Sequence, residues 1–256
     1  MIVTRVIPCL LLSKQGLVKT VKFRRPKYLG DPINVVRIFN DKEVDELVLL
    51  DILATPERQR PQFELIADIA SECFMPLCYG GGISTLEDVS RLCSLGVEKI
   101  AINTHAVEHP EFVRAAADLV GSSSVIVSMD VKRDIWGRYR VSTGGGRNPT
   151  RLDPARHAAH MEQHGAGEIL LNSVDRDGTM NGYDLELIRL VSQAVSIPVV
   201  ACGGAGSVED LAAAVRQGGA AAAAAGSLFV FNGPHRAVLI SYPPPARLRS
   251  LLGESS

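Results

Sequence analysis

The sequence lacks an excess of either charge. Its 256 residues include 27 basic and 28 acidic side chains, which gives a formal net charge of −1 at pH 7. Proteins that bind nucleic acids or membrane surfaces usually carry a basic field, so the composition predicts neither partner. No apolar run approaches the roughly 20 residues of a membrane-spanning helix, and the first residues have no signal-peptide cleavage site. We therefore expect a cytoplasmic protein, in which local basic groups can still bind a small anion.

Paired cysteines are also missing. The chain has five cysteines without any Cys-x-x-Cys motif, and most lie in apolar runs, which favours buried, reduced thiols: Cys9, Cys73, Cys78, Cys93 and Cys202. His157, His160 and His164 have helical spacing, but no paired cysteine or supporting acid accompanies them, so we expect an exposed polar helix face there. The sequence predicts neither a metal nor a cofactor.

Short apolar strands alternate with helical segments along the chain. Strands are expected near residues 5–10, 46–51, 76–79, 98–102, 124–130, 168–172, 197–201 and 220–225. The segments between them predict helices at Pro32–Phe39, Gln62–Ile69, Leu86–Leu95, Pro110–Leu119, Pro154–His164, Leu185–Ala194 and Val208–Gln217, with another after Pro234. Eight such units predict an α/β fold, a TIM (β/α)8 barrel that spans residues 1–256 as a single domain.

An internal repeat supports closure of the barrel. The run PLCYGGGISTLED from Pro76 matches PVVACGGAGSVED from Pro198, and DELVLL from Asp45 matches GEILLN from Gly167, both at an offset of 122 residues. This offset predicts two similar half-barrels, about residues 1–122 and 123–256.

Each half offers an anion site. A strand runs into two glycines and then a helix start, which exposes backbone N–H groups at the positive end of a helix. A second small polar element follows the fourth strand of each half. The candidate phosphate-binding and substrate-binding residues are Gly81, Gly82, Asn103 and Thr104 in the first half and Gly203, Gly204, Gly226 and Ser227 in the second. Two sites at one barrel mouth suit a substrate with two phosphates.

Four charged residues stand directly before apolar strand cores: Arg5, Glu46, Lys99 and Glu168. Residues at the start of barrel strands lie at the bottom of the barrel, so these two cations and two anions should meet around its axis. Charges buried there must pair. The ring is either a plug that serves stability alone or a gate across an axial passage.

A hairpin is expected after the fifth strand. Trp136 and Gly137 lie among the basic residues Arg133, Arg138 and Arg140, and Gly144-Gly145-Gly146 predicts a mobile loop over the mouth.

These motifs resemble, over nearly the whole chain, the cyclase subunit of imidazole glycerol phosphate synthase (HisF). The matching runs are IPCL at 7–10, GDP at 30–32, DELVLLDI at 45–52, YGGGI at 79–83, EKIAINT at 98–104, MDVKR at 129–133, GAGEILLNSVDRDGT at 165–179, GYDLELI at 182–188 and ACGGAGSVEDL at 201–211. The resemblance implies a TIM barrel that docks a HisH-like glutaminase below and conducts ammonia to a phosphorylated ribonucleotide above.

The resemblance also implies roles for single residues. Asp130 matches one of two catalytic aspartates, Lys19 matches a substrate-contacting lysine, and Asp177 falls among the substrate contacts. The family's gate matches the charged ring, and Glu98 lies beside that ring where the glutaminase docks.

Leu11 stands where the second catalytic aspartate belongs, within a stretch that should form a loop carrying Lys14, Gly16 and Lys19. Residues 18–23 and 229–245 depart from the family as well. These departures resemble those of paralogues encoded with surface-polysaccharide genes, which work with a glutaminase and a sugar amidotransferase to form acetamidino sugars of lipopolysaccharide or O-antigen.

Three hypotheses remain open. The chain is an ammonia-conducting subunit for another amidotransferase, with the cyclase (lyase) activity lost; or a working cyclase of histidine biosynthesis that uses Asp130 alone or a shifted acid such as Asp51; or a non-catalytic scaffold. Loss of a positioned acid or base typically costs about 10²–10⁴-fold in rate, which favours the first hypothesis.

Overall fold

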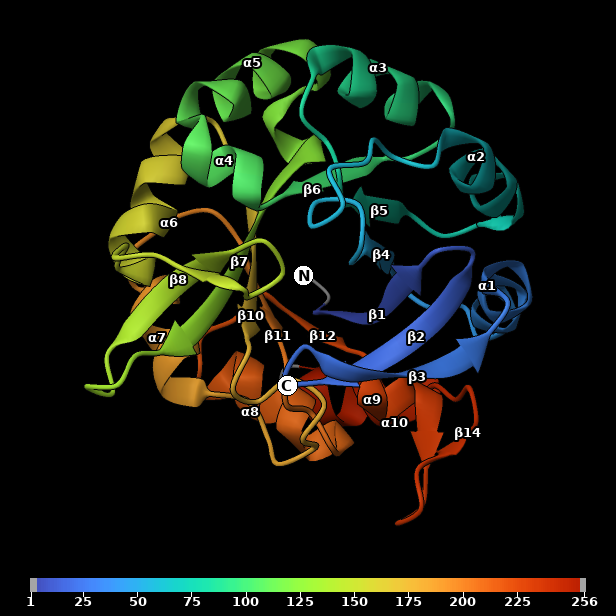
Figure 1. Cartoon of the computed structure of the whole chain (residues 1–256). Coiled ribbons are helices and arrows are strands. Elements are labelled where there is room, and N and C mark those ends of the chain that lie inside the picture. Colours follow the sequence, from blue (N-terminus) through green and yellow to red (C-terminus); the bar gives the residue numbers. More distant parts are fainter. Residues whose placement is uncertain (1–3, 254–256) are drawn as a thin grey trace.

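The computed structural model describes residues 4–253. Within that range eight parallel strands close into a barrel, and each pairs with the next in chain order until the last returns to the first. The strands are β1 (Arg5–Ser13), β4 (Leu47–Asp51), β5 (Leu77–Gly80), β6 (Lys99–Ile102), β7 (Val125–Arg133), β10 (Glu168–Ser173), β11 (Val199–Cys202) and β12 (Ala222–Ala225). Helices surround these strands (Figure 1). The predicted TIM barrel is confirmed.

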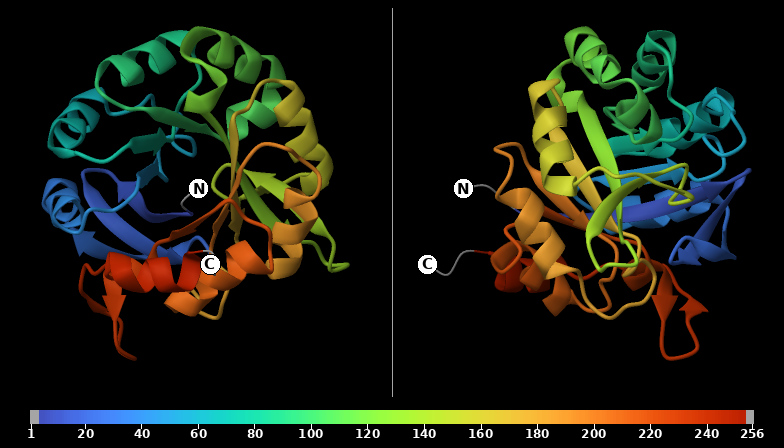
Figure 2. Two further views of the ribbon diagram at one scale, coloured as in Figure 1. Left: turned by 180° about the vertical axis from the view of Figure 1, so that it is seen from behind. Right: turned by 60° about the vertical axis from the view of Figure 1, so that its left-hand side comes forward.

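The helices between the strands lie close to where the sequence predicts them. They are α1 (Pro32–Asp41), α2 (Phe63–Glu72), α3 (Leu86–Ser94), α5 (Pro110–Val120), α6 (Pro154–Gln163), α7 (Leu185–Ser192) and α8 (Val208–Arg216). The two views of Figure 2 show them as one outer layer. None of the helices in the described part of the chain combines the length and apolar character needed to cross a membrane.

Helix α6 corrects one expectation. We expected an exposed polar face at His157, but this side chain is buried. The reason is that α6 packs against β7 and β8, and His157 shares its inner face with Ala158 and Met161. Burial lowers the pKa of His157 to about 4, so the imidazole is neutral near pH 7.

The stretch after the first barrel strand is not a loop. β1 continues to Ser13, turns back as β2 (Gly16–Val21), and is followed by the antiparallel strand β3 (Arg24–Gly30). Leu11 pairs with Val18 of β2 and with Leu50 of β4, so the apolar run extends the sheet instead of leaving it. Lys14 adopts a φ of 57°, which lets a two-residue turn reverse the chain.

The predicted hairpin after the fifth barrel strand is confirmed. The end of β7 pairs with β8 (Tyr139–Thr143), which in turn pairs with β9 (Asn148–Pro149). The glycine turn between β8 and β9 reaches the mouth, where the N–H of Gly144 donates to Oγ1 of Thr104 over 3.0 Å.

The C-terminal region corrects another prediction. A short hairpin of β13 (Phe231–Asn232) and β14 (Ala237–Val238) follows the barrel, and the helix α10 (Pro245–Leu252) begins only after it. Gly233 and Arg236 adopt positive φ, which turns the chain where we expected a helix. Two short helices, α4 (Thr104–Glu108) and α9 (Ser227–Val230), and the 3-10 turn Ser122–Ser124 were not predicted.

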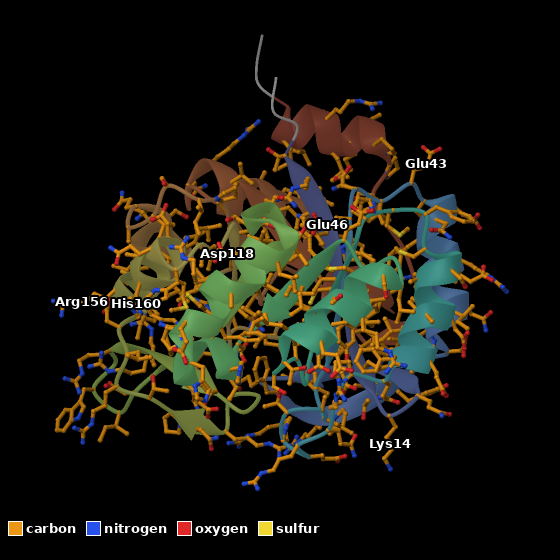
Figure 3. The ribbon with its side chains drawn as sticks, turned by 90° about the horizontal axis from the view of Figure 1, so that it is seen from above. Lys14, Glu43, Glu46, Asp118, Arg156 and His160 are labelled. Atoms are coloured by element: carbon orange, nitrogen blue, oxygen red, sulfur yellow. The ribbon has the colours of Figure 1, made fainter. Side chains whose placement is uncertain are left out.

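Alternate residues of the barrel strands face its axis. They form an apolar cluster separate from the larger core between strands and helices, made of Ile7, Cys9, Val48, Cys78, Ala101, Ile126, Leu170, Val200, Cys202, Ala222 and Ala224. Ala222 and Ala224 of β12 supply small inward side chains to this cluster. Glu46 and Lys14 lie toward opposite ends of the molecule (Figure 3), the charged ring at one and the mouth at the other.

The capping box of α8 provides a test of this framework. Oγ of Ser207 accepts from the N–H of Asp210 over 3.2 Å, and the Asp210 carboxylate accepts from the N–H of Ser207 over 3.0 Å. Ser207→Ala should cost about 1 kcal/mol of unfolding free energy. In a chain of this size that lowers Tm by roughly 2–4 °C. The control is Ser123→Ala at an exposed position. Equal melting temperatures for the two variants would contradict the cap's contribution.

Candidate active site at the barrel mouth

A cavity of about 490 Å³ opens where the barrel strands end. The predicted mouth residues all line it: Lys19, Gly81, Gly82, Asn103, Thr104, Asp130, Asp177, Gly203, Gly204, Gly226 and Ser227. They come from both halves of the chain and meet because parallel strands in a closed barrel end at the same rim. The cavity therefore brings together all the residues predicted for the mouth.

Asp130 is the acid of this cavity. It lies in β7 with 8% of its surface exposed, and its Oδ2 accepts from Nδ2 of Asn103 over 2.7 Å. Burial, followed by the negative charge of Asp177, raises the pKa of Asp130 to about 7, although hydrogen bonds from Asn172 and Asn103 act in the opposite direction. A carboxyl group with that pKa can donate or accept a proton near neutral pH.

Leu11 supplies an apolar wall to the same cavity. Its side chain is 9% exposed, and Leu50 on the neighbouring strand lies in register with it. We expected position 11 on a solvated loop; it lies instead within β1, with its side chain against the cavity. Position 11 thus faces the cavity, but its side chain has no ionisable group that could donate or accept a proton.

A buried ion pair stands on another side of the mouth. Nζ of Lys19 lies 2.7 Å from Oδ1 of Asp177, and Oγ1 of Thr20 donates to Oδ2 of the same carboxylate over 3.2 Å. The N–H of Lys22 donates to the backbone oxygen of Asp177 over 2.9 Å. These bonds attach the hairpin β2–β3 to the loop after β10, so Lys19 reaches the cavity from a fixed strand.

The two glycine pairs occupy equivalent turns. Gly81 and Gly82 have φ values of 125° and 72°, and Gly203 and Gly204 have 88° and 118°, all in the region that favours glycine. A Cβ on Gly204 would lie only 2.3 Å from the backbone oxygen of Gly182. No side chain fits there, and each turn leads into a capped helix, as an anion site needs.

Three buried polar atoms in the cavity wall have no partner among the described residues: Oδ1 of Asn103, Oδ1 of Asn172 and Oγ of Ser227. Buried polar groups are usually satisfied, so these atoms are available to a polar ligand or to water. Ser227 begins the short helix α9 directly after Gly226.

The residues of the charged ring meet at the other end of the axis. Arg5 contacts both Glu46 and Glu168. Nζ of Lys99 lies 2.9 Å from Oε2 of Glu46 and 3.1 Å from Oε2 of Glu168. Both carboxylates are buried, whereas the two cations are partly exposed. Glu98 is exposed directly before β6, next in the chain to Lys99 of the ring.

Asp51 is a further acid of the mouth, but its carboxylate is occupied. Its Oδ1 accepts from the N–H groups of Leu53 and Ala54 over 3.0 and 3.1 Å, and its Oδ2 accepts from Nε2 of Gln62 over 3.0 Å. The cavity wall also includes His105, on the short helix α4, and Arg147, in the turn between β8 and β9, neither of which was predicted from the sequence. Their proximity depends on the conformation of the segments that follow β6 and β8, which the sequence pattern does not reveal.

These features define a (β/α)8 barrel with a buried acid and two equivalent glycine turns at its mouth. The model of the family described as "Histidine biosynthesis protein" matches residues 5–234. The chain is 54% identical over 248 residues to a Pseudomonas aeruginosa protein named "Putative imidazole glycerol phosphate synthase subunit hisF2", which covers 97% of this chain and 99% of the relative. An Alkaliphilus metalliredigens protein named "Imidazole glycerol phosphate synthase subunit HisF" is 47% identical over 232 residues, or 91% of this chain and 92% of the relative. The chain therefore belongs to the HisF family of imidazole glycerol phosphate synthase subunits.

The pKa of Asp130 can be tested directly. In protein with ¹³C-labelled aspartate carboxyl groups, this residue should titrate near pH 7. Asp177→Asn should lower the midpoint, because it removes a neighbouring negative charge and leaves Lys19 unpaired. Asp118→Asn, an exposed change on α5, is the control. Since the folded pKa lies above the ordinary value of 3.8, the stability contributed by protonated Asp130 should be fully present below about pH 3.8 and lost progressively as the pH rises to about 7. A midpoint near 4 would refute this account.

Proposed function

We propose that the chain is the ammonia-conducting subunit of a glutamine-dependent amidotransferase complex. A glutaminase docks at the charged-ring end and releases ammonia into the barrel, and an acceptor enzyme uses that ammonia beyond the mouth. The acceptor is a sugar, amidated in lipopolysaccharide or O-antigen biosynthesis.

The observation that carries this proposal is Leu11 in the cavity wall. A general acid or base must reach a proton on its substrate within hydrogen-bonding distance. Leu11 has no proton to exchange, and the adjacent Leu50 has none either. Asp51 does not replace the missing acid, because its carboxylate is held by Leu53, Ala54 and Gln62. Asp130 is left without a second acid at the position where cyclisation needs one.

The charged ring supports conduction. Its four residues form a closed set of ion pairs, and above them the axis is lined by small and apolar side chains such as Ala222, Ala224 and Cys78. Buried ion pairs can often be replaced by apolar residues without loss of stability, so they are weak evidence for a purely structural role. Lys99 is partly exposed and has a long flexible stem, which suits it to open the ring.

The partners follow from the two ends of the axis. The exposed Glu98 beside the ring can pair with a cation of a HisH-like glutaminase. The proposal of a sugar amidotransferase as the acceptor enzyme is based on a resemblance: Leu11 and the altered residues 18–23 of the hairpin β2–β3 are similar to the departures seen in divergent paralogues. The five unpaired cysteines agree with a cytoplasmic location.

One observation favours a second candidate, the cyclase of imidazole glycerol phosphate synthase. The cavity keeps Asp130, the Lys19–Asp177 pair and both glycine turns, which could hold the two phosphates of that substrate. A non-catalytic scaffold has less support, because a scaffold needs neither an acid with a pKa of about 7 nor a cavity.

Cyclase activity separates the first two candidates. With the ribonucleotide substrate and abundant ammonium, the purified chain should form imidazole glycerol phosphate at least about 10²-fold more slowly than a cyclase that has both aspartates, because one proton-transferring group is missing. An authentic HisF is the positive control. Turnover within tenfold of that control would contradict the proposal.

Conduction is tested at Lys99. In a reconstituted complex of the chain with a HisH-like glutaminase and a sugar amidotransferase, Lys99→Met should lower the ratio of amidated product to glutamate, because ammonia escapes at an incomplete ring. Arg5 still contacts both carboxylates in this variant, so the fold should persist. Lys99→Arg is the control that keeps the charge. Added ammonium should restore product, and a wild-type ratio in Lys99→Met would show that the ring is structural.

A further inference from the structure

A basic groove lies beside the mouth, between the hairpins β2–β3 and β7–β8. Its lining contains eight basic side chains and one acidic side chain, Asp134. The groove therefore carries +7, which leaves −8 for the rest of a chain whose net charge is −1. Gly145, Arg147 and Phe23 line both the groove and the mouth cavity, so the two surfaces are continuous. None of the functions assigned above uses this groove.

Most of these cations lack an ion-pair partner. Arg133 pairs with Glu186, and Arg138 and Arg140 lie near Asp134. Within residues 4–253 no salt bridge reaches the other five, all of which are exposed: Lys22, Arg24, Lys132, Arg147 and Arg151. Unpaired cations gathered on one face repel one another, and an acidic partner relieves that repulsion.

Two large apolar side chains project beside the groove, at the tip of the hairpin β7–β8. Ile135 is 92% exposed and Trp136 is 74% exposed. The carboxylate of Asp134 holds the tip by accepting from the N–H groups of Trp136 and Arg138 over 2.9 and 3.0 Å. Lower down, Tyr139 donates to Oδ1 of Asp184 over 2.7 Å, which fixes the hairpin to the start of α7. The tip is thus preorganised, and tryptophan and arginine are the residues that most often dominate binding energy at protein interfaces.

We infer that the basic groove and the Ile135–Trp136 tip together form the docking surface for an acidic face of the acceptor enzyme. The inference rests on the proposed function, because it places that enzyme where ammonia leaves the mouth. A glutaminase at the charged ring would occupy the opposite end of the axis, so both partners can bind at once (Figure 3).

A protein fits this surface better than a nucleotide or a second copy of the chain. A small anion would be satisfied by the cations alone and leaves Ile135 and Trp136 exposed to water. A two-fold contact between copies would bring five unpaired cations against the same five. An acidic protein face that also offers an apolar pocket satisfies both parts of the surface.

The test uses Trp136, which is the only tryptophan of the chain. Biosynthetic labelling with 5-fluorotryptophan gives one ¹⁹F signal, located at the tip. Adding the unlabelled sugar amidotransferase of the reconstituted complex should shift or broaden this signal, and adding the glutaminase alone should not. Lys132→Glu/Arg151→Glu should weaken binding by about tenfold or more. The affinity that remains should depend less on salt concentration than the affinity of wild type does. Arg156→Glu, an exposed reversal on α6 outside the groove, should match wild type (Figure 3).

The functional measurement is amidated product per glutamate at limiting acceptor enzyme. This ratio should fall for Lys132→Glu/Arg151→Glu and for Trp136→Ala, while the glutaminase rate and the melting temperature stay near wild type. Normal product with an unmoved ¹⁹F signal would overturn the docking surface and leave the proposed function intact. No product from the wild-type complex, even with added ammonium, would instead remove the proposed function. A signal shift caused by uridine diphosphate and abolished by the double reversal, or self-association that depends on Trp136, would assign the surface to another occupant.

Discussion

Closure of the eight-stranded sheet determines which side chains share the axis of the barrel. Successive residues of a strand point to opposite faces, so every second residue faces inward once the sheet is closed. This rule places Arg5 and Ile7 of β1 on the same axis as Glu168 and Leu170 of β10. The charged ring, the apolar cluster and the polar mouth are successive layers along the axis, and this alternation sets all three. A shift of one residue in any strand would send its charged residue into the helix-facing core.

Buried charged groups are compensated differently at the two ends of the barrel axis. At the ring, Glu46 and Glu168 each contact both Arg5 and Lys99, so the buried charges are compensated by direct pairing. At the mouth Asp130 has only the amides of Asn103 and Asn172, and the raised pKa shows that they do not fully compensate its burial. The ring therefore compensates its buried charges by pairing, whereas the mouth holds a carboxyl group whose raised pKa lets it change its charge near neutral pH.

The barrel could be predicted from the sequence because its signals are periodic. Strand spacing, the repeat at an offset of 122 residues and helix caps such as Ser207 all indicate one architecture. The mouth residues follow from the same logic, since the ends of parallel strands converge. The turn after β1 was harder to predict from the sequence. Its residues at Lys14 include neither glycine nor asparagine, the usual signals of a two-residue hairpin turn, so we expected β1 to end before Leu11.

Other features depend on tertiary contacts that no local pattern records. The burial of His157 depends on the packing of α6 against β7 and β8, and the occupied carboxylate of Asp51 depends on Gln62, eleven residues away. The basic groove is assembled from two hairpins whose lining residues, such as Arg24 and Lys132, are more than 100 residues apart in the chain, so its charge is invisible in a near-neutral composition.

The apolar wall at the mouth also bears on the chemistry of ammonia. Ammonia is nucleophilic only while it is unprotonated, and it is a stronger base than a carboxylate. A second acid at position 11 would, while protonated, convert ammonia at the mouth into ammonium, which is not nucleophilic and, as a charged ion, crosses an apolar region poorly. Leu11 removes that proton donor without introducing a new polar group, and Leu50 beside it keeps the wall apolar. Under the proposed function, the loss of the acid protects the nucleophile, and Asp130, with its pKa of about 7, is a group at the mouth whose protonation can limit delivery as the pH falls.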